Sequence, residues 1–462
     1  MNKKRESFSG SIGFVLAAAG SAVGLGNIWR FPFLAARDGG GLFLVVYLVL
    51  ALTFGFTLLT AEVVIGRNTK SSPLTAYGKL SKRFGWVGAI ASIVPFMILP
   101  YYCVIGGWVL KYFIVFLAGY GLDTAADGYF GGFITAQYEP IIMLVIFLGI
   151  CAFIIYKGVA SGIEQYSKIL MPVLILLVIG ISVFAMTLKS TDASGNTVTA
   201  LQGMKVYLIP SFEGVTFKKF LLIVMDAAGQ LFYSLSIAMG IMIAYGSYVP
   251  DEANLVQSIN RIEIFDTAVA FLAGVMIIPA VFVFMGPDGM AAGPSLMFVS
   301  LPKVFAAMGP AGRVVGTLFF AMVLFAAVTS AMSVLEAVVS GLIDHFKLSR
   351  TKGTVLESVI ALALGILVCL GYNVFYFELP LPNGAVAQIL DIMDYISNYV
   401  LMPVVAIATC ILIGWVMKPE FVFKEAGKNG EELGRKGLFT LMIKFVAPVI
   451  LSILLLMSLG IL

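Results

Sequence analysis

Charge is scarce in this sequence. Of its 462 residues only 12% are Asp, Glu, Lys or Arg, whereas 60% are hydrophobic, and the mean hydropathy is +1.02. Helices of a soluble domain need polar faces, and few segments here have them. The composition is typical of a protein that crosses a lipid bilayer many times.

Histidine and cysteine are also rare. The single histidine, His345, stands beside Lys347 without a Cys or His partner for metal chemistry. Gly24-Leu25-Gly26-Asn27-Ile28-Trp29 departs from a dinucleotide-binding fingerprint, so the sequence does not favour a membrane enzyme. The four cysteines lie in apolar stretches with no metal-site or disulfide spacing, and we expect them to pack in the core: Cys103, Cys151, Cys369 and Cys410.

Long apolar runs are what the sequence has in abundance. A membrane span needs about 20 mostly apolar residues. No low-complexity tract or soluble domain separates the runs, so we expect one transmembrane domain over residues 1–462. Eleven stretches qualify as spans: 11–36, 41–66, 87–119, 140–156, 166–188, 221–249, 262–285, 312–343, 355–372, 387–416 and 439–461.

Basic residues gather in the loops of one side. Lys3, Lys4 and Arg5 begin the chain, and the loop after the second span has five basic residues and no acid. The 120–139 loop has three acids and no base. The positive-inside rule therefore predicts a multi-pass protein of the cell (inner or plasma) membrane, with a cytoplasmic N-terminus and, after an odd number of spans, an extracellular C-terminus.

The same loops account for the net charge of +4, so nothing indicates a nucleic-acid partner, and no obligate protein partner is evident. The lipid bilayer is the expected environment. A basic start before an apolar run also has the form of a signal peptide. Its cleavage would destroy the interrupted segment described next, so we expect no cleavage.

The first span is interrupted at its middle by Gly20-Ser21-Ala22-Val23-Gly24-Leu25-Gly26-Asn27, followed by Trp29-Arg30-Phe31-Pro32. A bilayer offers no water to backbone groups, so every N–H and C=O inside it needs a partner. Glycines, an Asn and an Arg are costly at this depth unless the helix breaks and its freed groups bind something. The interruption therefore points to ion-coupled transport.

A second interruption lies in the sixth span, where residues 229–240 combine Gln230, two hydroxyls and Gly240. The two interrupted spans are five apart and enter the membrane in opposite directions. Such pairs mark the midplane site of transporters built from inverted repeats. We expect residues 1–190 and 221–416 to be the two repeats, and 439–461 to be an additional helix.

Broken helices offer both signs of partial charge. Half-helix N-termini suit an anionic group, whereas C-termini and freed carbonyls suit a cation. Asn27 and Ser234 add oxygen ligands of the kind that a hard monovalent cation prefers. An ion channel and a transporter-like sensor are the alternatives. A channel usually needs a continuous pore built by symmetric rings, which two breaks in one chain fit less well.

These motifs resemble the neurotransmitter:sodium symporter family, whose bacterial members include LeuT-type amino-acid transporters. The resemblance covers nearly the whole chain. It implies an all-α integral membrane protein of the LeuT fold, with 11 transmembrane helices, a 5+5 inverted repeat and broken first and sixth helices. It rests on residues 21–32, Gly39-Gly40-Gly41, Glu62, Gly66-Arg67, Gly229-Gln230, Thr329-Ser330 and residues 391–394.

The resemblance also implies two sodium sites beside the breaks. The ligands implied for the first are Ala22, Asn27, Ser234 and Asp266, where most relatives have Asn in place of Asp266. Those implied for the second are Gly20, Val23, Ala326, Thr329 and Ser330. Without the resemblance, the two hydroxyls of Thr329 and Ser330 would be expected to bond back to their own helix.

A small neutral amino acid with a hydrophobic side chain is the substrate that the resemblance implies. The amides of Leu25 and Gly26 and the Tyr102 hydroxyl would hold its carboxylate. Gly24 stands where monoamine-carrying relatives have an Asp, and the flexible Met239 replaces an aromatic residue. The implied substrate-binding residues are Ala22, Leu25, Gly26, Ile98, Tyr102, Tyr233, Ser234, Ser236, Met239, Ser330 and Val334.

Two charged pairs match the family's gates. Arg30 and Asp394, with Tyr233, are implied as the outer gate, and the alternative is a structural ion pair. Arg5 and Asp344 are implied as the inner gate, and the alternative is two solvated surface charges.

Chloride-dependent relatives supply a negative charge near the first sodium through a bound anion. Tyr47, Gln230 and Ser234 stand at the matching anion-site positions, but Asp266 can provide that charge itself. We therefore expect no chloride requirement. Asp266 is also a candidate for carrying a proton in counter-transport.

Overall fold

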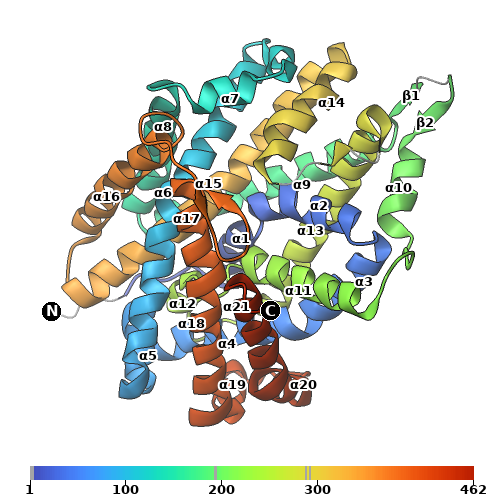
Figure 1. Ribbon diagram of the computed structural model, residues 1–462. Coiled ribbons are helices and arrows are strands. Elements are labelled where there is room, and N and C mark those ends of the chain that lie inside the picture. Colours follow the sequence, from blue (N-terminus) through green and yellow to red (C-terminus); the bar gives the residue numbers. More distant parts are fainter. Residues whose placement is uncertain (1–4, 192–194, 287–288, 291–292) are drawn as a thin grey trace.

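Helices make up most of the structure, a computed structural model that describes residues 5–191, 195–286, 289–290 and 293–462 (Figure 1). The first half contains α1 Ser11–Ala22, α2 Phe31–Arg37, α3 Gly41–Leu50, α4 Phe56–Thr69, α5 Pro73–Leu80, α6 Gly85–Leu117, α7 Tyr129–Ile134, α8 Glu139–Tyr156, α9 Gln165–Ala185 and α10 Ala200–Leu208. The second contains α11 Phe217–Ser234, α12 Ile241–Gly246, α13 Leu255–Met285, α14 Leu301–Ala307, α15 Pro310–Phe346, α16 Arg350–Leu370, α17 Ile389–Asp394, α18 Met402–Ile411, α19 Pro419–Ala426, α20 Lys436–Leu441 and α21 Ala447–Ser458.

Several membrane helices continue through π-helical turns. Such turns join α3 to α4, α17 to α18 and α20 to α21, so each pair forms one long helix. Another π-helical turn, Val159–Glu164, precedes α9. The apolar pattern does not reveal these wider turns, because they shift the helical phase by only one residue.

Nine helices in the described part of the chain are long and apolar enough to cross a membrane, and one bent pair makes a tenth. Eleven spans were expected, and the difference is the predicted span 221–249. It divides into α11, which carries Lys218, Lys219 and Asp226, and α12, which has six residues. The predicted break therefore explains why this span does not count as one continuous apolar helix.

The first predicted break is confirmed. Helix α1 ends at Ala22, and Val23 leaves the helical conformation with φ −74° and ψ 86°. A π-helical turn, Gly26–Arg30, then leads into α2, and the two halves meet at an angle of 53°.

The second predicted break is also present, between α11 and α12. Ser236, Ala238 and Gly240 all have positive φ angles, of 53°, 63° and 70°. The Ala238 amide, freed by the break, donates to Oε1 of the buried Glu62 at 2.7 Å. A Cβ at Gly240 would lie 2.8 Å from Pro73 Cγ and 2.9 Å from the Ala91 carbonyl, so this position requires glycine.

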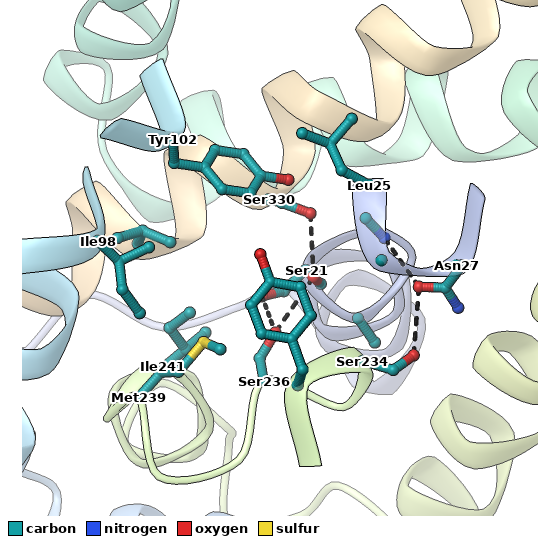
Figure 2. Close-up of a pocket in the computed structure, with 15 residues that line it drawn as sticks. Ser21, Leu25, Asn27, Ile98, Tyr102, Ser234, Ser236, Met239, Ile241 and Ser330 are labelled. Carbon is teal, nitrogen blue, oxygen red and sulfur yellow. Dashed lines mark hydrogen bonds between the residues drawn. The ribbon is translucent and has the colours of Figure 1, made fainter. Parts of the chain in front are cut away.

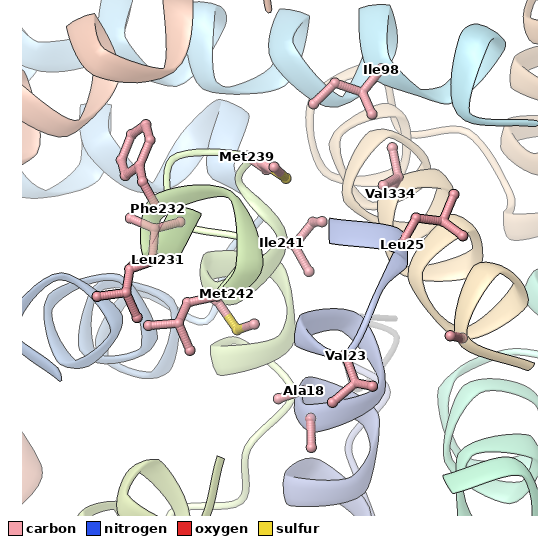
Figure 3. Close-up of a cluster of buried hydrophobic side chains, with 14 of the residues drawn as sticks. Ala18, Val23, Leu25, Ile98, Leu231, Phe232, Met239, Ile241, Met242 and Val334 are labelled. Carbon is pink, nitrogen blue, oxygen red and sulfur yellow. The ribbon is translucent and has the colours of Figure 1, made fainter. Parts of the chain in front are cut away.

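Buried apolar side chains surround the two breaks, as Figure 3 shows for Val23, Leu25, Ile241 and Met242. Helix α1 packs against α9, α13 and α15, and α12 packs against α4. A Cβ on Gly246 of α12 would lie 2.5 Å from the Val63 carbonyl of α4. Small residues allow such close helix contact in membranes, where packing rather than water drives association.

Two short antiparallel ribbons depart from the expectation of an all-α protein. Strand β1 (Lys189–Thr191) pairs with β2 (Thr197–Thr199), with Ser190 opposite Val198. Strand β3 (Leu379–Pro380) pairs with β4 (Val386–Ala387). These ribbons connect helices and leave the helical architecture unchanged.

Candidate functional site

A cavity of about 30 Å³ lies where the two broken helices meet (Figure 2). All eleven residues that the sequence implied for substrate binding line it, although their binding role stays a prediction. The lining consists of Ser21, Ala22, Gly24, Leu25, Gly26, Asn27, Ile98, Tyr102, Tyr233, Ser234, Ser236, Met239, Ile241, Ser330 and Val334.

A cluster of buried oxygens adjoins the cavity at Asn27, Ser234 and Asp266. The Ser234 hydroxyl donates to Asp266 Oδ1 at 2.7 Å and lies 3.2 Å from Asn27 Oδ1. The Asn27 amide donates to Asp266 Oδ1 at 2.8 Å, and the Tyr47 hydroxyl lies 3.5 Å from Asp266 Oδ2. Three side chains predicted for the first sodium site are therefore in mutual contact.

The charge of Asp266 is not balanced by any described Lys or Arg. Its side chain is completely buried, and the described side chains that bond to it, Asn27, Tyr47 and Ser234, are neutral. A buried carboxylate without a counter-charge is costly. These residues therefore fit a monovalent cation, held by oxygens of Asn27, Ser234 and Asp266.

The hydroxyls of Thr329 and Ser330 behave differently from each other. Thr329 donates back to the carbonyls of Phe325 and Ala326 at 3.0 and 3.1 Å, as a helix hydroxyl often does. Ser330 reaches across to α1, with its Oγ 3.1 Å from the Ser21 carbonyl and 3.4 Å from the Gly20 carbonyl. Oxygens from α1 and α15 thus converge, which fits the second predicted cation site.

Tyr102 presents an unsatisfied polar group to the cavity. Its hydroxyl is buried and has no hydrogen-bond partner among the described residues. In Figure 2 it points toward Ser330 and Leu25, where the second half of the broken helix begins. The first amides of a helix lack intrahelical partners, so a hydroxyl and free amides face the same space.

Close packing restricts two glycines of the first break. A Cβ on Gly24 would lie 2.9 Å from Ser330 Oγ and 3.3 Å from the Tyr102 hydroxyl. A Cβ on Gly26 would lie 2.8 Å from the Tyr233 ring. An acidic side chain at position 24 would therefore fill the cavity.

Tyr233 also lines a second cavity, of about 180 Å³, and so separates the two. Arg30 and Asn398 line this second cavity. The predicted outer pair is not joined directly, because no described ion pair links Arg30 to Asp394. Asp394 instead accepts hydrogen bonds from Tyr101 at 3.1 Å and Asn398 at 2.6 Å.

The predicted inner pair is in direct contact. Both Asp344 carboxylate oxygens accept from Arg5 Nη1, at 2.7 and 2.8 Å. Arg5 also donates to Ser247 at 2.8 Å and stacks over the Tyr248 ring at 4.9 Å, and Asp344 accepts from the Ser72 amide. The two charges are therefore a partly buried ion pair, not solvated surface charges, and their role as a gate stays a prediction.

Sequence reasoning missed several members of the site. Ser21 links the breaks, because its carbonyl accepts from Ser236 at 3.2 Å. Ile241 lines the cavity as the first residue of α12. The positive φ angles that bring Ser236 and Ile241 inward leave no trace in the hydrophobic pattern. In the described part of the chain, no three His, Cys, Asp or Glu residues are grouped as for a metal ion, and the oxygens gathered at this site are one carboxylate, that of Asp266, with carbonyl, amide and hydroxyl oxygens.

Comparison with known proteins adds independent findings. The profile of the Sodium:neurotransmitter symporter family matches residues 5–120 and 131–461. An uncharacterized sodium-dependent transporter of Bacillus subtilis, YhdH, is 32% identical over 100% of this chain and 99% of its own. The rat sodium- and chloride-dependent GABA transporter 2 is 25% identical over 81% of this chain and 69% of its own.

Among solved structures, bacterial MhsT in complex with L-phenylalanine superimposes with a TM-score of 0.84. It is 33% identical, and the match covers 98% of this chain and 100% of MhsT. The folds therefore agree over nearly the whole chain.

Proposed function

Since this chain belongs to the sodium:neurotransmitter symporter family, a family of multi-pass membrane transporters and not of enzymes, we propose that it carries a neutral, hydrophobic amino acid together with sodium. The observation that carries the proposal is Asp266, a completely buried carboxylate that no described Lys or Arg pairs with and whose charge a bound cation would balance. It stands with Asn27 and Ser234 at the junction of two broken helices.

Two sodium ions are proposed to bind. The first would be held by Ala22, Asn27, Ser234 and Asp266, and the second by Gly20, Val23, Ala326, Thr329 and Ser330. One charge crossing 100 mV gains about 2.3 kcal/mol, so two sodium ions with a zwitterion gain about 4.6 kcal/mol. This corresponds to roughly a thousandfold accumulation of the substrate.

The Tyr102 hydroxyl supports an amino acid as the substrate. A carboxylate can accept from this unsatisfied donor and from the free amides at Leu25 and Gly26. Ile98, Met239 and Val334 give the rest of the cavity an apolar wall, which suits a neutral side chain. The phenylalanine bound to MhsT, which shares the fold and 33% of the sequence, agrees with this class.

Chloride is proposed to be unnecessary. Asp266 accepts from Ser234 and lies near the Tyr47 hydroxyl, which are two of the groups expected to hold an anion in relatives. These contacts support the proposal that the Asp266 carboxylate supplies the negative charge that a bound anion would otherwise provide. Proton counter-transport through Asp266 is also proposed, because a buried carboxylate can take up a proton on the return step when no cation is bound beside it.

Alternating access is proposed to move two inverted repeats, residues 1–190 and 221–416, past each other, with 439–461 outside them. Equivalent contacts support the repeats: α6 packs on α8 as α15 packs on α16, and α1 packs on α13 as α11 packs on α3. In this structure the Arg5–Asp344 pair closes the side that charge bias predicts to be cytoplasmic. The C-terminus is correspondingly proposed to be extracellular.

A thermal-shift screen of the twenty amino acids, with and without sodium, tests the proposal. A substrate that binds the folded state raises the melting temperature, and we expect this rise to require sodium. Tyr102→Phe should weaken binding about 10- to 100-fold, since a hydrogen bond to a charged group is lost. The matched control is Tyr112→Phe on the same helix, whose hydroxyl donates to the Phe298 carbonyl at 2.9 Å outside the cavity.

The screen contradicts the proposal if no amino acid produces a sodium-dependent shift, or if both variants lose binding equally. Uptake into proteoliposomes then separates a transporter from a sensor, which would bind without accumulating the amino acid. Single-channel currents would instead indicate a channel.

A further inference from the structure

A groove of about 390 Å³ lies between α8 and α16, which pack side by side away from the breaks (Figure 1). Its walls are apolar side chains such as Val145, Phe153, Val359 and Leu362. Arg350 at the start of α16 donates to the Ile155 carbonyl at 3.3 Å, so α16 begins where α8 ends. This end is on the side of the Arg5–Asp344 pair, which charge bias predicts to be cytoplasmic.

Two hydroxyls in this groove are unsatisfied. Thr354 and Ser358 both line it, and their oxygens are buried without a hydrogen-bond partner in the described structure. Thr354 is only 2% exposed. Helix hydroxyls usually donate to a carbonyl one turn earlier, as Ser333 does to Thr329 at 2.7 Å. Thr354 and Ser358 make no such bond and offer free donors to an acceptor in the groove.

Positive charge flanks the mouth of the groove. Lys157 follows α8 directly and stacks 4.6 Å above the Phe153 ring, while Lys352 precedes Thr354 on α16. Neither lysine has a carboxylate partner among the described ion pairs. Arg350 is also at this end, but Glu336 and Glu6 neutralise it.

We propose that this groove binds one anionic phospholipid of the cytoplasmic leaflet. Its phosphate lies between Lys157 and Lys352, its ester oxygens accept from Thr354 and Ser358, and one acyl chain follows the apolar walls. Basic side chains at the membrane surface, free hydroxyls below them and an apolar channel beyond match the three parts of a phospholipid in order. The proposal does not depend on the identity of the transported substrate.

Native mass spectrometry of the full-length protein, released from nanodiscs of phosphatidylglycerol or phosphatidylcholine, tests this lipid site. We expect one phosphatidylglycerol to remain bound at activation energies that remove phosphatidylcholine. Replacing both lysines (Lys157→Gln with Lys352→Gln) should weaken retention about 30-fold, from the usual contribution of a basic residue near anionic lipid. The matched control is Lys82→Gln with Lys424→Gln, two exposed lysines away from the groove.

A second variant fills the groove itself. A Cβ at Gly149, which lines the groove, meets no atom within 4 Å, so Gly149→Trp can extend into the groove without disturbing the helix. It should abolish retention, whereas Gly180→Trp, equally free of neighbours but on α9, should not. Equal retention of both lipids, or retention that survives both the lysine and the Gly149 changes, would overturn the proposal.

Discussion

Asp266 stands at a position where the family resemblance implies Asn in most relatives. We expect Asp266→Asn to make uptake depend on chloride, since Tyr47 and Ser234 would then face a site without its own negative charge. Uptake by the variant should fall about tenfold or more when gluconate replaces chloride, while the natural protein is unaffected.

Glu357→Gln serves as the control for this experiment. It also neutralises a buried carboxylate, but one on α16 that does not line the cavity between the breaks. If the natural protein itself loses uptake in gluconate, the assignment of Asp266 as the substitute for chloride is wrong.

Two buried glutamates should respond in opposite ways to neutralisation. Glu336 pairs with Arg350 at 2.7 Å and accepts from Tyr248 at 2.6 Å, whereas Glu357 has a carboxylate oxygen without a partner in the described structure. Glu336→Gln should destabilise the protein by about 3–5 kcal/mol, because the largely buried guanidinium of Arg350 loses its buried negative partner. Glu357→Gln should preserve or raise the melting temperature, because an unpaired buried carboxylate is costly.

At the scale of elements, the break between α11 and α12 depends on backbone that few residues tolerate. Gly240→Ala should lower the melting temperature by several degrees, because φ is 70° and the new methyl would meet Pro73 and the Ala91 carbonyl. Gly180→Ala, in a helix and without close neighbours, is the control and should change little. Equal melting temperatures for the two variants would show that the backbone around Gly240 adjusts to a side chain, so that glycine is not required there.

The positions of the two breaks could be predicted from the sequence because polar and glycine residues at mid-membrane depth have few other uses. Their exact form could not. The Glu62 bond to the Ala238 amide joins residues 176 positions apart, and the positive φ of Ser236 contradicts its ordinary preference. The described helices that pass as apolar spans are one fewer than the eleven expected, since the second break leaves α11 and α12 too short or too charged to pass as one apolar helix.

Across the whole molecule, the two charged pairs differ. Arg5 and Asp344 form an ion pair, whereas Asp394 bonds to Tyr101 and Asn398 rather than to Arg30. The structure is therefore closed on the side of its N-terminus. The larger second cavity lies beyond Tyr233, on the side of Arg30 and Asn398.

Asp344→Asn should loosen the closed side. We expect faster amide hydrogen exchange across α1, because Arg5 loses its charged partner and the Ser72 amide a strong acceptor. The control is Asp251→Asn, in the loop before α13. Hydrogen bonds from Lys70 and Lys428 lower the pKa of the Asp251 carboxyl to about 2. That carboxylate stays charged from neutral pH down to its folded pKa, so its exposed pairs add no pH dependence near neutrality.

If the amide hydrogen exchange of α1 is the same in both variants, the Arg5–Asp344 ion pair does not stabilise the closed state.

The sequence by itself determined that the protein spans the membrane many times, that two of its spans are interrupted, and which family it resembles. These follow from local composition, because a bilayer penalises every misplaced polar group. Only the tertiary structure decided which groups meet: that Asp266 has neutral partners alone, that Ser330 rather than Thr329 reaches α1, and that the outer pair stays apart. Such pairings join residues hundreds of positions apart, and their geometry depends on how whole helices pack.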